Sequence, residues 1–266
     1  MSIYLSPGIT VYCCVIAWFF GTVMGSFLNC AAWRIAHKES FLKGRSRCPQ
    51  CDHKLGALEL IPVFSWIFLG GKCKSCKKKI PARYPLTELF FGAVTVLTLL
   101  RFDLSVEFLR DFVFICCLFC LSLVDLEICE IPNGTLIIAA AAWLIALPFM
   151  SEPLERLKYG LIAGVGFGAA LLGLSLIMDR VLKRDSLGGG DIKLFAVVGL
   201  YLGIVGTLFG VMLACVLGLL FALVRKLAVK KQGAFPFGPA ISAAAAVMLL
   251  YGEGAVRAYL EFAGLA

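Results

Sequence analysis

Charge and histidine are both scarce in this chain of 266 residues. Asp, Glu, Lys and Arg make up only 16% of it, whereas 61% of the residues are hydrophobic and the mean hydropathy is +0.92. So little charge excludes a soluble domain of this length, and the composition predicts a polytopic membrane protein. His37 and His53 are the only histidines, and neither lies in a Ser-His or Cys-His arrangement. Carboxylates therefore remain as the candidate acid and base.

The hydrophobic runs are long enough for transmembrane helices, which need about 20 mostly apolar residues to cross a hydrocarbon core of about 30 Å. Ile9 to Trp33 contains no charge and no basic region precedes it, so we expect a retained helix, not a secretory signal peptide. Leu194 to Val224 would extend about 46 Å as one helix, and Gly203 and Gly206 offer a place to turn. The other expected spans are Pro85 to Leu100, Phe112 to about Ile131, Pro132 to Met150, Tyr159 to Met178 and Phe237 to Tyr251.

The distribution of Lys and Arg favours eight spans with the N-terminus outside. In that topology the inner segments 34–84, 180–193 and 225–231 hold 20 of the 25 basic residues, as the positive-inside rule predicts. A single span over 194–224 would place the last basic cluster outside and weaken this asymmetry. We therefore predict an all-α polytopic membrane protein with about eight transmembrane helices and a small cytoplasmic insertion between the first two.

Two aspartates lie at the edges of these apolar segments. Asp125 ends the third span and Asp191 begins the sixth, so the topology brings both to the cytoplasmic edge of the membrane. An ionisable residue in such a place is a candidate functional residue, although each aspartate could also be an ordinary charge at a helix end. Two carboxylates that share a site cannot both ionise cheaply, and such a pair can activate a water molecule. Other acids nearby are Glu127, Glu130, Asp179 and Asp185.

The neighbours of the two aspartates suit a catalytic loop. The glycines from Gly188 to Gly190 remove three Cβ atoms before Asp191, which lets the backbone approach a substrate, or else simply forms a turn after a helix. Pro132 predicts a helix start that ends the loop carrying Asp125. Lys193 either biases the carboxylate pair electrostatically or extends its amine to the membrane interface.

The polar region from Arg34 to Arg83 contains an internal repeat of cysteine knuckles. Cys48 and Cys51 form one C-x-x-C pair, Cys73 and Cys76 form another, and 21 residues separate the pairs. This spacing is typical of a structural zinc site, and so short an insertion needs a metal cross-link of this kind to fold. Disulfides are the competing interpretation, but charge asymmetry places the segment in the reducing cytosol, where thiolate ligands are favoured.

The formal net charge of +8 has a membrane explanation. Five lysines crowd the second knuckle, and beside a membrane they favour anionic lipid and set the topology. We therefore expect the lipid bilayer as a partner and no nucleic acid. The lysines are Lys72, Lys74, Lys77, Lys78 and Lys79.

Taken together, these motifs resemble those of the bacterial type IV prepilin leader peptidases, membrane aspartic proteases of the GxGD type. The resemblance rests on motifs in a matching order along nearly the whole chain. They are Gly25-Ser26-Phe27-Leu28-Asn29 with Arg34, the two knuckles, Gly71-Lys72-Cys73, Arg83-Tyr84-Pro85-Leu86 with Glu88, Asp125 with Pro132, Gly188-x-Gly190-Asp191-x-Lys193, and Pro236-Phe237-Gly238-Pro239. Ala36 and Asn133 depart from the family pattern, and neither is a proposed catalytic carboxylate.

The resemblance implies a function, a location and a division of the chain. It implies that Asp125 and Asp191 cleave the leader of prepilin or pseudopilin substrates for type IV pili and type II secretion, in the bacterial inner membrane. It also implies N-methylation of the new N-terminus with S-adenosylmethionine, at a binding site that the sequence does not locate. The expected domains are a first transmembrane helix at 1–33, a zinc-binding insertion at 34–84 and a peptidase core at 85–266.

Two readings from other functional classes stay open at the level of the sequence. Intramembrane acids also mark ion or solute transporters, with the zinc domain acting as a gate. Against this, both carboxylates are expected at one membrane edge instead of the midplane, and no inverted repeat is visible. The second reading is an assembly protein without catalytic activity that binds partners through its knuckles.

Overall fold

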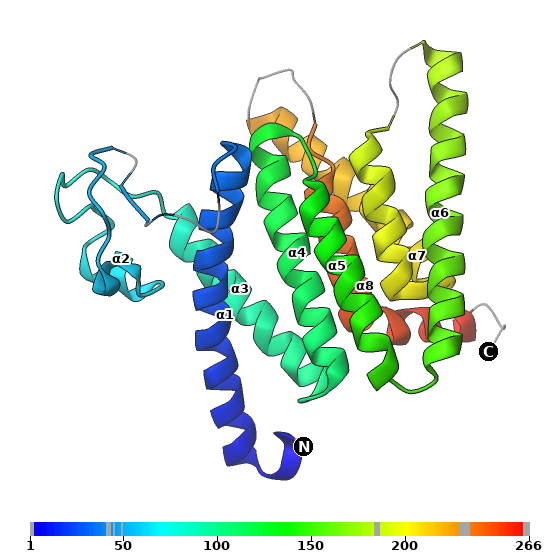
Figure 1. The fold of residues 1–266 in the computed structure, drawn as a ribbon, viewed down its shortest axis with the longest axis horizontal. Helices are drawn as coiled ribbons and strands as arrows, with labels where there is room; N and C mark the ends of the chain where they lie inside the picture. The colour runs from blue at the N-terminus through cyan, green and yellow to red at the C-terminus, as the bar shows by residue number, and fades with distance from the viewer. Residues whose placement is uncertain are drawn as a thin grey trace. The chain divides into compact units, whose positions relative to one another are not determined.

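The computed structural model describes residues 3–40, 44, 46–48, 50–183, 187–228 and 235–262. Within these residues the regular structure is helical, with no named strand. This confirms the predicted all-α class, in which the cysteine segment lies between the first two long helices. The α-helices, shown in Figure 1, are α1 (Pro7–Ala36), α2 (Phe64–Phe68), α3 (Arg83–Phe102), α4 (Val106–Ile128), α5 (Asn133–Ala146), α6 (Pro153–Leu182), α7 (Gly189–Ala228) and α8 (Gly238–Phe262).

Five helices are long and apolar enough to cross a membrane, namely α1, α3, α6, α7 and α8. The apolar helical segment Asn133–Phe149, which contains α5, is shorter. α4 is also long, but it carries charged residues near both ends, among them Arg110, Asp111 and Asp125. The chain is thus a multi-pass membrane protein, as its composition predicts.

The long uncharged run forms a helical hairpin in α7. Gly203 interrupts the helix with φ 67° and ψ −172°, a conformation that glycine adopts without steric cost. In Figure 1 the half that follows Gly203 runs back toward the end at which α7 begins. With α7 counted as two helices and the five-residue α2 left out, the described residues contain eight helices, which agrees with the predicted number of about eight.

The described chain forms two compact units, residues 1–108 and 109–266. In the first unit α1 packs closely on α3 through Gly21 and Gly25 of α1, which are four residues apart, and through Gly92 of α3. A Cβ atom on Gly25 would lie 3.0 Å from the Phe91 Cβ, and one on Gly92 would lie 2.8 Å from the Thr22 Cγ2. Small residues of this spacing let membrane helices approach each other.

The second unit has its core among α4, α5, α7 and α8. Phe114, Leu121, Leu194 and Ile241 are almost completely buried there. α6 packs on α7 so tightly that a Cβ atom on Gly199 would lie 2.7 Å from the Gly164 Cα. This contact fixes the first half of α7, whose opening residues include Asp191.

A buried ion pair lies near the start of α4. The Arg110 guanidinium donates to the Asp111 carboxylate from Nε at 2.6 Å and from Nη2 at 2.9 Å, and both side chains are buried. The same guanidinium lies 5.4 Å from the centroid of the Tyr201 ring. Arg110 therefore holds helices together instead of presenting its charge to solvent.

Candidate active site and metal centre

Asp125 lies in the last turn of α4 with its carboxylate buried. Its Oδ2 accepts a hydrogen bond from the backbone N–H of Gly238, the first residue of α8, at 2.8 Å. The N-terminus of a helix carries partial positive charge, so this contact favours the ionised carboxylate. A Cβ atom on residue 238 would lie 2.8 Å from the same oxygen, which means that only glycine permits this approach.

Asp191 lies in the first turn of α7, where the glycine run places it near Asp125. The Asp191 N–H donates to the Gly188 carbonyl at 3.0 Å. A Cβ atom on Gly190 would lie 3.0 Å from the Ile131 Cβ, so the glycine turn packs against the loop that follows α4. The charges of Asp125 and Asp191 are close enough to interact. The helices thus bring together two carboxylates that are 66 positions apart in the sequence.

Lys193 and Pro132 belong to a second link between the same two segments. The Lys193 amine donates to the Asn133 side-chain oxygen at 3.0 Å. Asn133 is the first residue of α5, and Pro132 is its N-cap, one position from the expected place. Lys193 thus connects the start of α7 to the start of α5, a contact that explains its position without direct contact to a carboxylate.

Two acids near the end of α4 are exposed to the surroundings. Glu127 and Glu130 are both exposed, whereas Asp125 is buried. Asp179, near the end of α6, accepts a hydrogen bond from Ser175 at 3.4 Å. Asp185 lies outside the described residues.

Sequence reasoning missed Gly238 as a partner of Asp125. The motif Pro236-Phe237-Gly238-Pro239 marks the start of a helix, but nothing in it indicates which carboxylate the helix meets. The Phe237 ring lies over Gly218 of α7, where a Cβ atom would be 2.6 Å from Phe237 Cε2. This packing places the adjacent Gly238 N–H at the Asp125 side chain.

The four knuckle cysteines converge in the first unit. The sulfur atoms of Cys48, Cys51, Cys73 and Cys76 all lie within 4.8 Å of one another. The Cys48–Cys76 and Cys51–Cys73 sulfur distances are 4.0 and 3.9 Å, about twice the length of a disulfide bond. Four sulfurs at about 2.3 Å from one tetrahedral metal would be about 3.8 Å apart. The cluster therefore fits a metal ion and excludes the disulfide interpretation.

The two knuckles repeat each other in backbone detail. Cys48 N–H donates to the His53 carbonyl and Cys73 N–H donates to the Lys78 carbonyl, both at 2.9 Å. Asp52 and Lys77, each directly after a C-x-x-C pair, both have positive φ, at 58° and 59°. The backbone N–H groups of Cys76 and Ser75 lower the pKa of Cys73 to about 6. A thiol in this environment is ready to bind metal as a thiolate.

Two family models match the regions of the chain that contain these two sites. The model of the bacterial Peptidase A24 N-terminal domain matches residues 19–102, and that of the Type IV leader peptidase family matches residues 112–223. A prepilin leader peptidase/N-methyltransferase of Bacillus subtilis (strain 168) is 36% identical over 257 residues, covering 93% of this chain and 98% of the relative. One of Stutzerimonas stutzeri is 31% identical, covering 83% and 76%.

A third relative carries a different name. The type 4 prepilin-like proteins leader peptide-processing enzyme of Escherichia coli O78:H11 is 30% identical over 248 residues, covering 86% of this chain and 90% of the relative. No solved structure matches the chain. Two consecutive family models and relatives aligned over most of both chains give the same assignment: this protein belongs to the type IV leader peptidase family.

Proposed function

We propose that this protein removes the leader peptide of type IV prepilin-like proteins and then N-methylates the new amino terminus. The names of its relatives support both activities. The convergence of Asp125 and Asp191 from the end of α4 and the start of α7 is the observation that carries the peptidase proposal. A transporter is not favoured, because the relatives are named as peptidases and both carboxylates lie at helix ends.

The proposed chemistry is peptide hydrolysis by a water molecule held between Asp125 and Asp191. One carboxyl stays protonated and polarises the scissile carbonyl, while the other takes a proton from the attacking water. That proton then passes to the leaving amine nitrogen as the peptide bond breaks. The two groups titrate as a pair, so the proton belongs to the dyad and not to one named residue.

The surroundings of the dyad have supporting roles in this proposal. Gly188 and Gly190 let the backbone of the turn come close to the substrate, and the Gly238 N–H orients Asp125. Lys193 and Pro132 hold the starts of α7 and α5 in place. The exposed carboxylates of Glu127 and Glu130 receive the basic leader of the substrate.

We infer that the protein lies in the bacterial inner membrane with its N-terminus outside. Support comes from the 20 of 25 basic residues that fall on the inner segments. This orientation puts the dyad at the cytoplasmic face, where the basic leader precedes the hydrophobic helix of the substrate. The proposed parts are residues 1–33 as the first transmembrane helix, 34–84 as the zinc-binding insertion and 85–266 as the peptidase core.

Zinc is the metal that we assign to the four cysteines. Cys48, Cys51, Cys73 and Cys76 would hold it as a closed tetrahedral site, which stabilises a fold and leaves no open position for catalysis. The ion would cross-link and stabilise an insertion that is too short to build a large hydrophobic core. The peptidase step proceeds at the two carboxylates without it.

S-adenosylmethionine is the proposed methyl donor, and it would supply an electrophilic methyl group for the new amine. A cavity of about 340 Å³ lies in the second unit, lined among others by Arg110, Trp143 and Tyr201. It lies at the start of α4 and beside Gly203, whereas the dyad lies at the end of α4 and the start of α7. This cavity does not fit a donor that must reach the cleaved amine, so we assign it no part in methyl transfer.

The test uses purified protein in detergent with a full-length prepilin. Asp125→Asn and Asp191→Asn should each lower cleavage by at least about 10³-fold, because an amide cannot exchange the catalytic proton. Glu107→Gln, in the first turn of the same α4, is the matched control and should cleave normally. Full activity in either aspartate variant would remove that carboxylate from the mechanism.

The same variants separate the two activities. Asp125→Asn should still methylate a synthetic mature pilin segment in the presence of S-adenosylmethionine, because methyl transfer needs a positioned amine and donor instead of a water-activating pair. Methyl incorporation is measured by mass spectrometry of the peptide. A wild-type protein that cleaves normally and transfers no methyl group would be a peptidase only.

A further inference from the structure

The segment between the two knuckles is unusually apolar for a part of a water-exposed insertion. Leu60 to Leu69 contains no charged residue. Several of its large side chains are exposed, and Phe68 and Ile67 keep 83% and 58% of their surface accessible. Neither the cysteine cluster nor the packing of α1 on α3 accounts for this face. The other exposed members are Leu60, Ile61 and Phe64.

This segment lies beside the middle of α1 instead of beyond its end. The Phe64 ring stacks on the Phe19 ring with centroids 6.2 Å apart and planes at 15°. Phe19 precedes the end of α1 at Ala36 by 17 residues, about 25 Å along the helix axis. Since a hydrocarbon core is about 30 Å thick, Phe19 lies well inside the membrane-crossing part of α1.

A buried carboxylate holds the segment at this level. Glu88 of α3 is 7% exposed, and its Oε2 accepts a hydrogen bond from the Val63 N–H at 2.7 Å. Ser26 of α1 also hydrogen-bonds to this side chain. Ser26 precedes Ala36 by 10 residues, about 15 Å, so the attachment is also below the end of the helix.

The turn that Glu88 holds is a strained one. Val63 has φ 62° and ψ −56°, and the Phe64 N–H donates to the Pro62 carbonyl at 2.6 Å. This is a three-residue γ-turn, which a β-branched residue rarely adopts. Such strain persists where surrounding contacts require it. Here the turn reverses the chain and starts α2 against α1.

Backbone N–H groups along the turn and α2 bond to groups of the protein itself, as lipid requires. The Ser65, Ile67 and Leu69 N–H groups donate to carbonyls four residues earlier. The Gly71 N–H donates to the Trp66 carbonyl at 2.8 Å. The Trp66 indole N–H donates to the Ile80 carbonyl at 3.1 Å, which closes the segment against the second knuckle.

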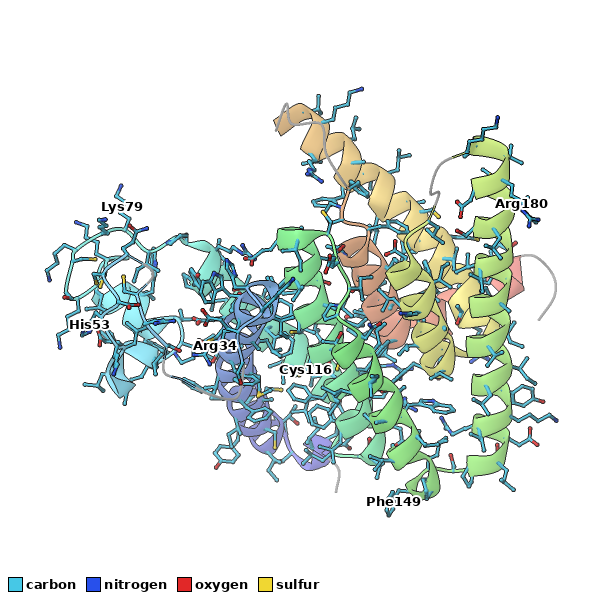
Figure 2. The ribbon with its side chains drawn as sticks, turned by 45° about the horizontal axis from the view of Figure 1, so that its top comes forward. Arg34, His53, Lys79, Cys116, Phe149 and Arg180 are labelled. Atoms are coloured by element: carbon cyan, nitrogen blue, oxygen red, sulfur yellow. The ribbon has the colours of Figure 1, made fainter. Side chains whose placement is uncertain are left out.

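We propose that residues 60–69 form a re-entrant membrane element whose exposed apolar face lies in lipid hydrocarbon. The knuckles then sit at the membrane surface, with the lysines of the second knuckle facing anionic headgroups. His53 and Lys79, in the insertion, are labelled in Figure 2 together with Arg34 near the end of α1. In this proposal Glu88 anchors the membrane element through the Val63 N–H. The proposal is independent of both proposed activities, peptide cleavage and N-methylation.

Photocrosslinking to lipid tests the proposal in native membranes. The full chain carries p-benzoylphenylalanine in place of Phe68, and lipid adducts are identified by mass spectrometry with fragmentation of the lipid. The same replacement at Ile16, exposed on α1 near the level of Phe19, is the positive control. Replacement at the exposed Lys79 of the second knuckle is the matched negative control.

We expect acyl-chain adducts at Phe68 with a yield within about threefold of that at Ile16, and none at Lys79. Headgroup adducts alone, equal acyl-chain labelling at Lys79, or a crosslink to protein instead of lipid would each overturn the proposal. Bound zinc reports whether each variant has folded. If the Phe68 variant lacks zinc, the neighbouring exposed Ile67 replaces it, and the same outcomes decide.

Discussion

The Gly238→Ala substitution tests whether the start of α8 positions Asp125. The new Cβ would lie 2.8 Å from the Asp125 Oδ2, closer than real Cβ atoms come, and 3.2 Å from its Cγ, which is a tight contact. Either the carboxylate or the helix start must move, and the hydrogen bond from the Gly238 N–H at 2.8 Å is lost or lengthened.

The size of the effect follows from that hydrogen bond. A hydrogen bond to a charged group contributes about 1.5–3 kcal/mol. At about 1.4 kcal/mol for each factor of ten, its loss in the transition state lowers kcat by about 10- to 150-fold. Displacement of a catalytic group by about 1 Å gives a loss of similar size. We expect kcat to fall with little change in KM, because the substrate's binding contacts remain.

The assay is steady-state cleavage of a prepilin by purified variants in detergent. Gly254→Ala is the matched control, because the same substitution in the same helix α8 meets no atom within 4 Å. Both variants should retain zinc. Gly254→Ala should keep wild-type stability within about 1 kcal/mol, since helix propensity favours alanine over glycine, whereas Gly238→Ala should lose no more than the contribution of its hydrogen bond, about 1.5–3 kcal/mol. Wild-type kcat in Gly238→Ala, beside an inactive Asp125→Asn, would refute the positioning role.

Two further predictions concern the metal and the buried ion pair. Metal analysis should find about one zinc per chain, which replacement of Cys48, Cys51, Cys73 and Cys76 by serine removes, with destabilisation of the insertion. Brief chelation should leave proteolysis intact, because the dyad needs no metal, whereas prompt and zinc-reversible inhibition of folded protein would indicate a metalloprotease. Asp111→Asn should lower the free energy of unfolding by about 3–5 kcal/mol, because it leaves the buried Arg110 charge without its carboxylate partner. Denaturation in detergent measures it, and Glu261→Gln, which breaks the exposed Arg257–Glu261 pair, should change it by less than about 0.5 kcal/mol.

Several features could be predicted from sequence because they depend on local composition or spacing. The membrane class follows from long apolar runs, since each must be buried in lipid or protein. The break in α7 follows from its length, and Gly203 supplies the positive φ that a turn requires. The cysteine cluster follows from its spacing, because a C-x-x-C turn presents both sulfurs to one point.

Other features required the tertiary structure. Nothing near Asp125 in the sequence indicates that the N–H of Gly238, 113 positions away, meets its carboxylate. The charge count treats Arg110 as an outer cation, whereas packing buries it against Asp111 and Tyr201. From sequence, the apolar stretch after the first knuckle is predicted to be part of a cytoplasmic insertion. The structure shows that it lies beside α1, because the Phe64 ring contacts the Phe19 ring.

The sequence by itself determined which segments are apolar, where the chain can turn and which side chains can carry charge or bind metal. These are properties of single residues and of short spacings, so they survive without knowledge of the fold. Only the tertiary structure decided which helix end faces which carboxylate and how deep the segment before α3 lies. Those are contacts between residues far apart in the chain, and they depend on how closely glycine-lined helices such as α6 and α7 can pack.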